Sequence, residues 1–310
     1  KKAETGIWRA LDPLGKGVNR LANRAGAESF WPTELAEGEI EKAARILRSF
    51  SDGAQADDDG DLSGGVADPK GKGKKDKRHQ KVVKKIPPKA LQGACGIVIM
   101  TLFRTGFGVS GASGSGVVVA RLPDGSWSPP SGLLVHTIGF GWLIGLDVYD
   151  VVLVLRKPGA LEEFMKPKVS LGVEFSVAAG PVGNGAMLEG GPNGAACWSY
   201  TKSKGAYVGL QLDGSVILKR DDANARFYGG SYSVRDILQG RAMANAAAVR
   251  PLLATLYAAE GRPQIMGTQY VPQGPAPGDT MITDQEKAAL QQQAQAQEQH
   301  GASNPYAAGA

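Results

Sequence analysis

The sequence predicts an α+β fold, in which a mainly antiparallel, curved or barrel-like β-sheet rich in glycine is flanked by N- and C-terminal helices. The chain has 310 residues, of which 43 are glycine, roughly twice the usual share of about 7%. Its hydrophobic fraction of 42% is that of a globular protein. Apolar residues recur with period two between residues 86 and 219, and with helical period before and after. This order indicates one sheet with helices at both ends of the chain.

Residues 1–32 predict a basic amphipathic arm. Asp12 is placed to cap a helix, and Pro13 suits its first turn. The helix then carries an apolar stripe and basic flanks, formed by Leu14, Val18, Leu21 and Ala25 and by Arg9, Lys16, Arg20 and Arg24. Such a helix suits either a membrane surface or the folded core, and the residues alone do not choose between them.

A second helix is predicted over residues 33–50. Thr33 is a candidate N-cap for this helix. Its apolar residues recur at spacings of three, four and seven, at Ile40, Ala43, Ala44 and Leu47. Acidic residues suit the positive end of its dipole, at Glu37, Glu39 and Glu41.

The basic residues are concentrated in one stretch. Residues 70–89 contain ten Lys and Arg against one Asp, a local balance of +9, whereas the whole chain carries +5. An acidic block at residues 57–61 precedes this run, and both contain few large apolar side chains. They cannot bury enough surface to offset the entropy of ordering, so residues 51–80 are predicted to form a disordered charged insertion.

Five segments with alternating or β-branched apolar residues predict strands, at residues 97–103, 116–121, 148–155, 169–178 and 206–218. The most apolar stretch, residues 133–155, contains Asp147 and Asp150. An Asp at mid-bilayer costs about 3 kcal/mol, so strands are favoured there over a membrane span. The sequence Pro123-Asp124-Gly125 predicts a turn.

Three further helices and a tail follow from local signals. A short helix is predicted at residues 159–165, and Ser233 with Asp236 has the spacing of a capping box that starts a helix ending at Gly240. The last helix is expected to have Pro251 near its start and Gly261 at its end. Residues 262–310 are rich in Pro and Gly, then in Gln and Ala, and predict a disordered tail.

Residue types for catalysis are scarce. His136 is the histidine that falls in a predicted strand, so a Ser/His or Cys/His pair would depend on it. Cys95 and Cys197 have no metal-ligand spacing and are interpreted as reduced core residues. The glycine-rich residues 111–116 lack the Lys-Ser/Thr of a phosphate loop and lead into a strand, which favours a strand bend. We therefore expect that the protein is not an enzyme and has no catalytic residue.

Asp150 is an acidic residue on an apolar strand face, where a carboxylate is partly desolvated unless it is paired. Glu174 and Asp213 lie on the polar faces of other predicted strands and are weak candidates to join it around a cation such as Ca²⁺. The alternative is a structural carboxylate held by hydrogen bonds. No other cofactor is expected.

A series of motifs, in this order along the chain, resembles the SYLF domain family. The series comprises IPPK at residues 86–89, GSGVV at 114–118, LPDGSWSPPS at 122–131, GFG at 139–141, SVAAGPVG at 176–183, LDGSV at 212–216 and FYG at 227–229. The ordered set is far more specific than any one motif, and the resemblance covers residues 33–261.

The resemblance implies a non-enzymatic module that binds phosphoinositide membranes and actin filaments in cortical actin organisation and endocytosis. It also implies a cytoplasmic location, peripheral to the membrane and the actin cortex. The sequence departs from the family pattern in its insertion at residues 51–80, and residues 262–310 hold no SH3 or FYVE domain.

Lipid contact is expected where the basic run adjoins the predicted core, at Lys81, Lys84, Lys85 and Lys89. The arm is expected to add charge and interfacial side chains, at Arg20, Arg24, Trp8, Phe30 and Trp31. Each Lys or Arg near an anionic leaflet contributes about 1 kcal/mol. The alternatives are a solubilising charge run, a calcium- or small-ligand-binding β-core, and nucleic-acid binding. No aromatic residues interleave the run, as single-strand stacking requires.

Overall fold

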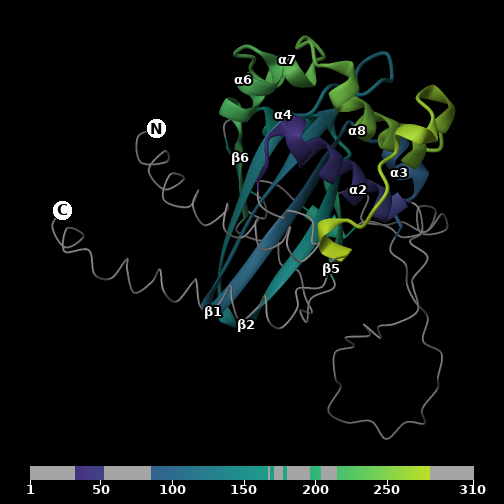
Figure 1. Cartoon of the computed structure of the whole chain (residues 1–310). Helices are drawn as coiled ribbons and strands as arrows, with labels where there is room; N and C mark the ends of the chain where they lie inside the picture. The colour runs from purple at the N-terminus through teal and green to yellow at the C-terminus, as the bar shows by residue number, and fades with distance from the viewer. Residues whose placement is uncertain are drawn as a thin grey trace, which may run out of the picture.

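The computed structural model describes residues 32–51, 85–166, 168–170, 177–179, 196–203 and 215–279. For residues 104–111, 137–147, 168, 170, 177–179, 203 and 215 it describes the backbone alone. Within these residues, six strands form one sheet, with helices before and after it in the chain (Figure 1). The predicted α+β class is confirmed.

Two strands of 25 residues each, β1 (Gly96–Ala120) and β2 (Ser131–Leu155), form the antiparallel pair at the centre of the sheet. β6 (Ser215–Lys219) and β5 (Cys197–Ser203) pair antiparallel with the first and last parts of β2. β3 (Lys168–Ser170) pairs antiparallel with β6, and β4 (Val177–Ala179) pairs parallel with β5. The sheet is therefore mainly antiparallel, as predicted, and the described strands form an open sheet instead of a closed barrel.

β1 bends so far that its two ends lie side by side. Arg121 N, just beyond the strand, donates a hydrogen bond of 2.9 Å to Cys95 O, just before it. Gly116 allows the two halves of the strand to approach, because an added Cβ would lie 2.1 Å from Ile99 O. Residues 111–116 thus belong to a bent strand, as predicted.

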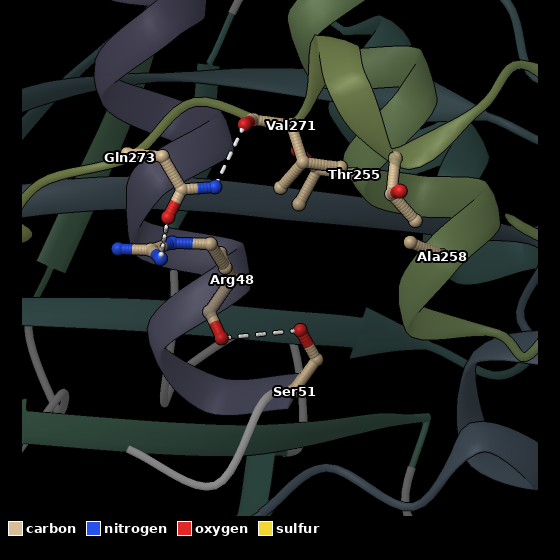
Figure 2. A pocket seen from close by; sticks show the side chains of 7 residues that line it. Arg48, Ser51, Thr255, Ala258, Val271 and Gln273 are labelled. Carbon is tan, nitrogen blue, oxygen red and sulfur yellow. Dashed lines mark hydrogen bonds between the residues drawn. The ribbon is translucent and has the colours of Figure 1, made fainter. Parts of the chain in front are cut away.

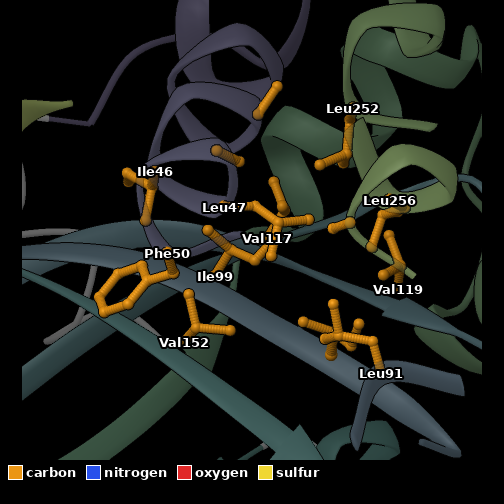
Figure 3. Close-up of a cluster of buried hydrophobic side chains, with 14 of the residues drawn as sticks. Ile46, Leu47, Phe50, Leu91, Ile99, Val117, Val119, Val152, Leu252 and Leu256 are labelled. Atoms are coloured by element: carbon orange, nitrogen blue, oxygen red, sulfur yellow. The ribbon is translucent and has the colours of Figure 1, made fainter. Parts of the chain in front are cut away.

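One face of the sheet is covered by α2 (Ile40–Ser51), α3 (Pro88–Gln92) and α8 (Ala246–Ala259). Leu47 of α2 and Leu252 of α8 pack over Val117 of β1 (Figure 3). All three side chains are fully buried. Full burial of one such side chain contributes about 1.5–3 kcal/mol, so this layer supplies much of the stability of the fold.

The other face is covered by α4 (Pro158–Met165) and α7 (Val234–Leu238). Phe164 and Leu238 pack there with Val118 of β1 and Leu153 of β2. Because both faces are covered, successive residues of β1 and β2 are buried on opposite sides. This accounts for the long apolar stretch at residues 133–155, which forms β2. None of the helices in the described ranges is long and apolar enough to cross a bilayer.

Most predicted helices are confirmed, with two corrections to their ends. Thr33 is not the N-cap of the second helix, because η1 (Leu35–Glu39) precedes α2 and Thr33 donates its N–H and hydroxyl to the Glu39 carboxylate. Pro251 is not near the start of α8, which begins after Asn245. The capping box at Ser233 and the left-handed glycine at Gly261 are confirmed.

Residues 262–279 correct the predicted tail. They form three 3-10 turns, η2 (Pro263–Ile265), η3 (Thr268–Tyr270) and η4 (Pro277–Asp279), and Ala276 in this stretch is buried in the core. Small residues in this segment, such as Ala276 and Gly278, allow it to lie close to the sheet. The predicted arm, the insertion at residues 52–80 and the tail beyond residue 279 lie outside the described residues.

A helix that the sequence did not predict, α6 (Asp221–Tyr228), fixes the start of β2. Asn224 accepts a hydrogen bond of 2.8 Å from Gly132 N and donates one of 3.0 Å to Ser131 Oγ. The sequence gives little sign of this helix, because it has only eight residues and the contacts that hold it include hydrogen bonds to distant residues.

Candidate functional site

Two of the lysines predicted to contact lipid lie at the edge of the folded core. Lys85 precedes α3 and Lys89 lies within it, and both side chains are exposed. The other residues of this prediction lie outside the described residues, namely Lys81, Lys84, Arg20, Arg24, Trp8, Phe30 and Trp31. The lipid assignment therefore stays a prediction, with two of its cations now placed on the surface.

A buried ionic network anchors the start of α2 to β1. Lys42 Nζ lies 3.0 Å from Glu39 Oε2 and 3.1 Å from Ser115 Oγ, and Ser115 Oγ donates to Glu39 Oε1 at 2.8 Å. Burial raises the pKa of Glu39, but the charges of Lys42 and Arg220 and the hydrogen bonds from Ser115 and Thr33 outweigh it and hold that pKa below its usual range. The position of Glu39 in the sequence indicated only a favourable interaction with the helix dipole. Its actual role is this network.

Asp150 is fully buried on β2 beneath the η4 turn. Its Oδ2 accepts a hydrogen bond of 2.8 Å from Gly278 N. A Cβ at Gly278 would lie 2.7 Å from the same oxygen, so only glycine fits over the carboxylate. Beside it, Lys202 Nζ forms an ion pair of 2.5 Å with Asp279 Oδ1. A backbone hydrogen bond thus holds this carboxylate inside the fold, and its part in a cation site stays a prediction.

Burial raises the pKa of Asp150 to about 7, against the opposing effects of the Gly278 N–H and the Thr101 side chain. The folded-state pKa therefore lies above the ordinary value of 3.8, and the folded protein holds a proton that the unfolded chain releases. Its contribution to stability is complete below the unfolded pKa and is lost as the pH rises through the folded pKa.

We expect the free energy of unfolding to fall between pH 4 and pH 7, by at most about 1.4 kcal/mol per pH unit from this one group. Asp150→Asn should remove most of that slope, whereas Asp222→Asn, at an exposed position, should keep it. Urea unfolding of the three proteins at half-unit pH steps measures the slopes. Equal slopes in wild type and Asp150→Asn would contradict the assignment.

The predicted cation site is not assembled by the described residues. Glu174 and Asp213 lie outside them, so their convergence on Asp150 stays untested. Within the described ranges, no three His, Cys, Asp or Glu side chains gather as metal ligands.

A small cleft of about 120 Å³ lies between the end of α2, α8 and η3 (Figure 2). Its lining residues are Arg48, Ser51, Thr255, Ala258, Thr268, Val271 and Gln273. Arg48 Nη1 donates to Gln273 Oε1 at 3.0 Å. The lining contains no acid, histidine or cysteine, so it offers no general base and no strong nucleophile.

His136 makes a contact between neighbouring strands. Its Nδ1 lies 3.3 Å from Ser113 Oγ, its register partner on β1. Burial lowers the pKa of His136, and neither residue lines the cleft. Cys95 and Cys197 are free thiols. Ser113 and His136 thus form a hydrogen bond between neighbouring strands, away from the cleft.

Part of the chain matches a known protein family. Residues 136–259, from near the start of β2 to the end of α8, match the Ysc84 family, described as "Las17-binding protein actin regulator". Over these residues the chain is similar to the SYLF domain of the Ysc84 family. The resemblance read from the motifs is confirmed.

Several curated relatives are 40–41% identical to the chain over 159 to 175 residues. The chain is 41% identical over 175 residues, 55% of its length, to SH3 domain-containing protein PJ696.02 of Schizosaccharomyces pombe, and covers 40% of that protein. It is 40% identical over 160 residues, 50% of its length, to LAS seventeen-binding protein 3 of Saccharomyces cerevisiae, covering 35% of it. The human SH3 domain-containing YSC84-like protein 1 is 40% identical over 159 residues, 50% of this chain and 46% of that protein. The match thus spans less than half the length of these relatives. No solved structure matches the chain.

Proposed function

We propose that this SYLF domain binds actin filaments and phosphoinositide-bearing membranes without catalysis, and acts in cortical actin organisation and endocytosis. The observation that carries the proposal is the match of residues 136–259 to a family of actin regulators. We also propose that the domain binds proteins of the Las17 type, because the family description names Las17.

Charge supports the membrane part of the proposal. The run at residues 70–89 carries ten Lys and Arg and meets the folded core at two exposed side chains, Lys85 and Lys89. Since each cation near an anionic leaflet contributes about 1 kcal/mol within a Debye length, several of them suffice for recruitment at physiological salt.

The lipid assignment is tested on Lys81, Lys84, Lys85 and Lys89 together. We expect the wild-type chain to pellet with phosphatidylcholine vesicles that contain phosphatidylinositol bisphosphate, and the fourfold Lys→Gln variant to lose about 4 kcal/mol of binding free energy. Unchanged pelleting of the variant would refute the assignment of these lysines, whereas no pelleting of the wild type would refute membrane binding.

A further inference from the structure

Cationic side chains from three layers of the fold lie at one end of the sheet. Cys95 N donates to Leu155 O at 2.8 Å, and Arg121 N donates to Cys95 O at 2.9 Å. These bonds place the start of β1, its end and the end of β2 side by side. Arg121 and Arg156, the residues that follow β1 and β2, therefore lie at the same edge.

The helices of one face close over this edge. Gln92 of α3 donates its side-chain N–H to Glu260 O, at the end of α8, at 2.7 Å. Arg121 and Arg262 both donate to Gly125 O, at 3.0 and 3.3 Å. The exposed lysines before and within α3, and Arg262 after α8, thus border the strand ends.

The helix on the other face reaches the same edge. An added Cβ at Gly96 would lie 2.9 Å from Leu161 Cδ1, so α4 packs directly on the start of β1. Lys157, the residue before α4, is exposed and follows β2 by two residues. Arg156 stacks over Trp198, with its guanidinium carbon 4.0 Å from the ring centre.

We call this edge the basic rim and define it by its six cations, Lys85, Lys89, Arg121, Arg156, Lys157 and Arg262. Four acids belong to the same segments. Glu162 and Glu163 lie in α4, and Glu163 pairs with Lys166 at 2.6 Å. Glu260 is buried and shared by Arg121 and Arg262, and the Asp124 carboxylate accepts hydrogen bonds from Ser126. The rim therefore carries an excess of positive charge that runs across both helical layers and the strand ends between them.

We infer that the basic rim is the face by which the domain docks, end-on, on an anionic bilayer, an inference that rests on the membrane binding proposed above. The three exposed cations of the rim are all lysines, whereas its three arginines are half-buried. Lysine is depleted at protein–protein interfaces, so a membrane fits the rim better than an acidic protein. Ile265, three residues beyond Arg262, is 48% exposed and offers an aliphatic side chain beside the charges. The inference adds Lys157 and Arg262, which lie far in the sequence from the lysine run.

Lys157 separates end-on docking from docking through the lysine run alone. It lies on the face opposite α3, its side chain is exposed, and it makes no side-chain hydrogen bond that caps α4. The urea midpoint of Lys157→Gln shows whether the fold is kept. We expect this change to lower partition of the full chain onto phosphatidylcholine vesicles with 20% phosphatidylserine about fivefold. Lys166→Gln, an exposed lysine at the opposite end of α4, is the matched control and should change partition less than about twofold.

This sedimentation assay distinguishes the proposed membrane binding from docking through the basic rim. If the wild type binds vesicles and Lys157→Gln binds as Lys166→Gln does, the inferred rim is wrong while membrane binding stands. If the wild type does not bind vesicles, the proposed membrane binding is wrong, and so is the inference that the rim is the docking face. If Lys157→Gln weakens pelleting with actin filaments but not with vesicles, the rim is a protein-binding face, and the inference is overturned.

Discussion

Replacing Glu39 by alanine is expected to lower the free energy of unfolding by about 3–5 kcal/mol. The change leaves the Lys42 ammonium buried beside Ser115 with its main counter-charge removed. Removing one partner of a buried ion pair destabilises a protein more than replacing both partners by apolar residues. The reason is that an uncompensated charge then stays in the protein interior. Urea unfolding at pH 7 measures the loss.

Two variants control this result. Glu41→Ala removes the partner of Arg45 in an exposed pair and should cost less than about 1 kcal/mol. Replacing both Glu39 and Lys42 by methionine removes both charges and should recover much of the loss. Because the pKa of Glu39 is held low, the gap between wild type and Glu39→Ala should shrink as the pH falls through the folded-state pKa. A Glu39→Ala variant no less stable than Glu41→Ala would show that the network does not anchor α2.

Gly116→Ala is expected to destabilise the fold by about 3 kcal/mol or more, because overpacking against backbone cannot be relieved by a side-chain rotation. The added Cβ would lie 2.1 Å from Ile99 O and 2.6 Å from Met100 Cα. Relief requires the two halves of β1 to separate, which opens the core on both faces. Soluble yield and the urea midpoint measure the effect.

Gly159→Ala is the matched control for this change. Gly159 lies in α4 with no atom within 4 Å of its added Cβ, so alanine there should raise stability by about 0.5 kcal/mol. If Gly116→Ala proves as stable as Gly159→Ala, the halves of β1 do not approach each other as described.

The sequence predicted the elements whose signals are local. The apolar spacing of α2, the capping box at Ser233 and the left-handed Gly261 each depend on neighbouring residues, and each is confirmed. The burial of Asp150 also followed from its place on an apolar strand face. These features could be predicted because three to eight adjacent residues determine them.

The remaining features depend on residues far apart in the chain. The bend at residues 111–116 was predicted, but β1 was expected as two short strands, and the contact between its two halves joins residues that lie far apart in the chain. The role of Glu39 depends on Ser115, 76 residues away. Lys157 and Arg262 look like isolated surface charges in the sequence, and only the meeting of the strand ends with α3, α4 and α8 brings them together.

The central claim is that the domain joins an anionic membrane to actin filaments. Its most direct measurement is the recruitment of labelled filaments to giant vesicles that contain phosphatidylinositol bisphosphate, with and without the protein. We predict filaments on the vesicle surface only when the protein is present, and fewer with Lys157→Gln. Filaments that stay in solution at saturating protein would contradict the claim.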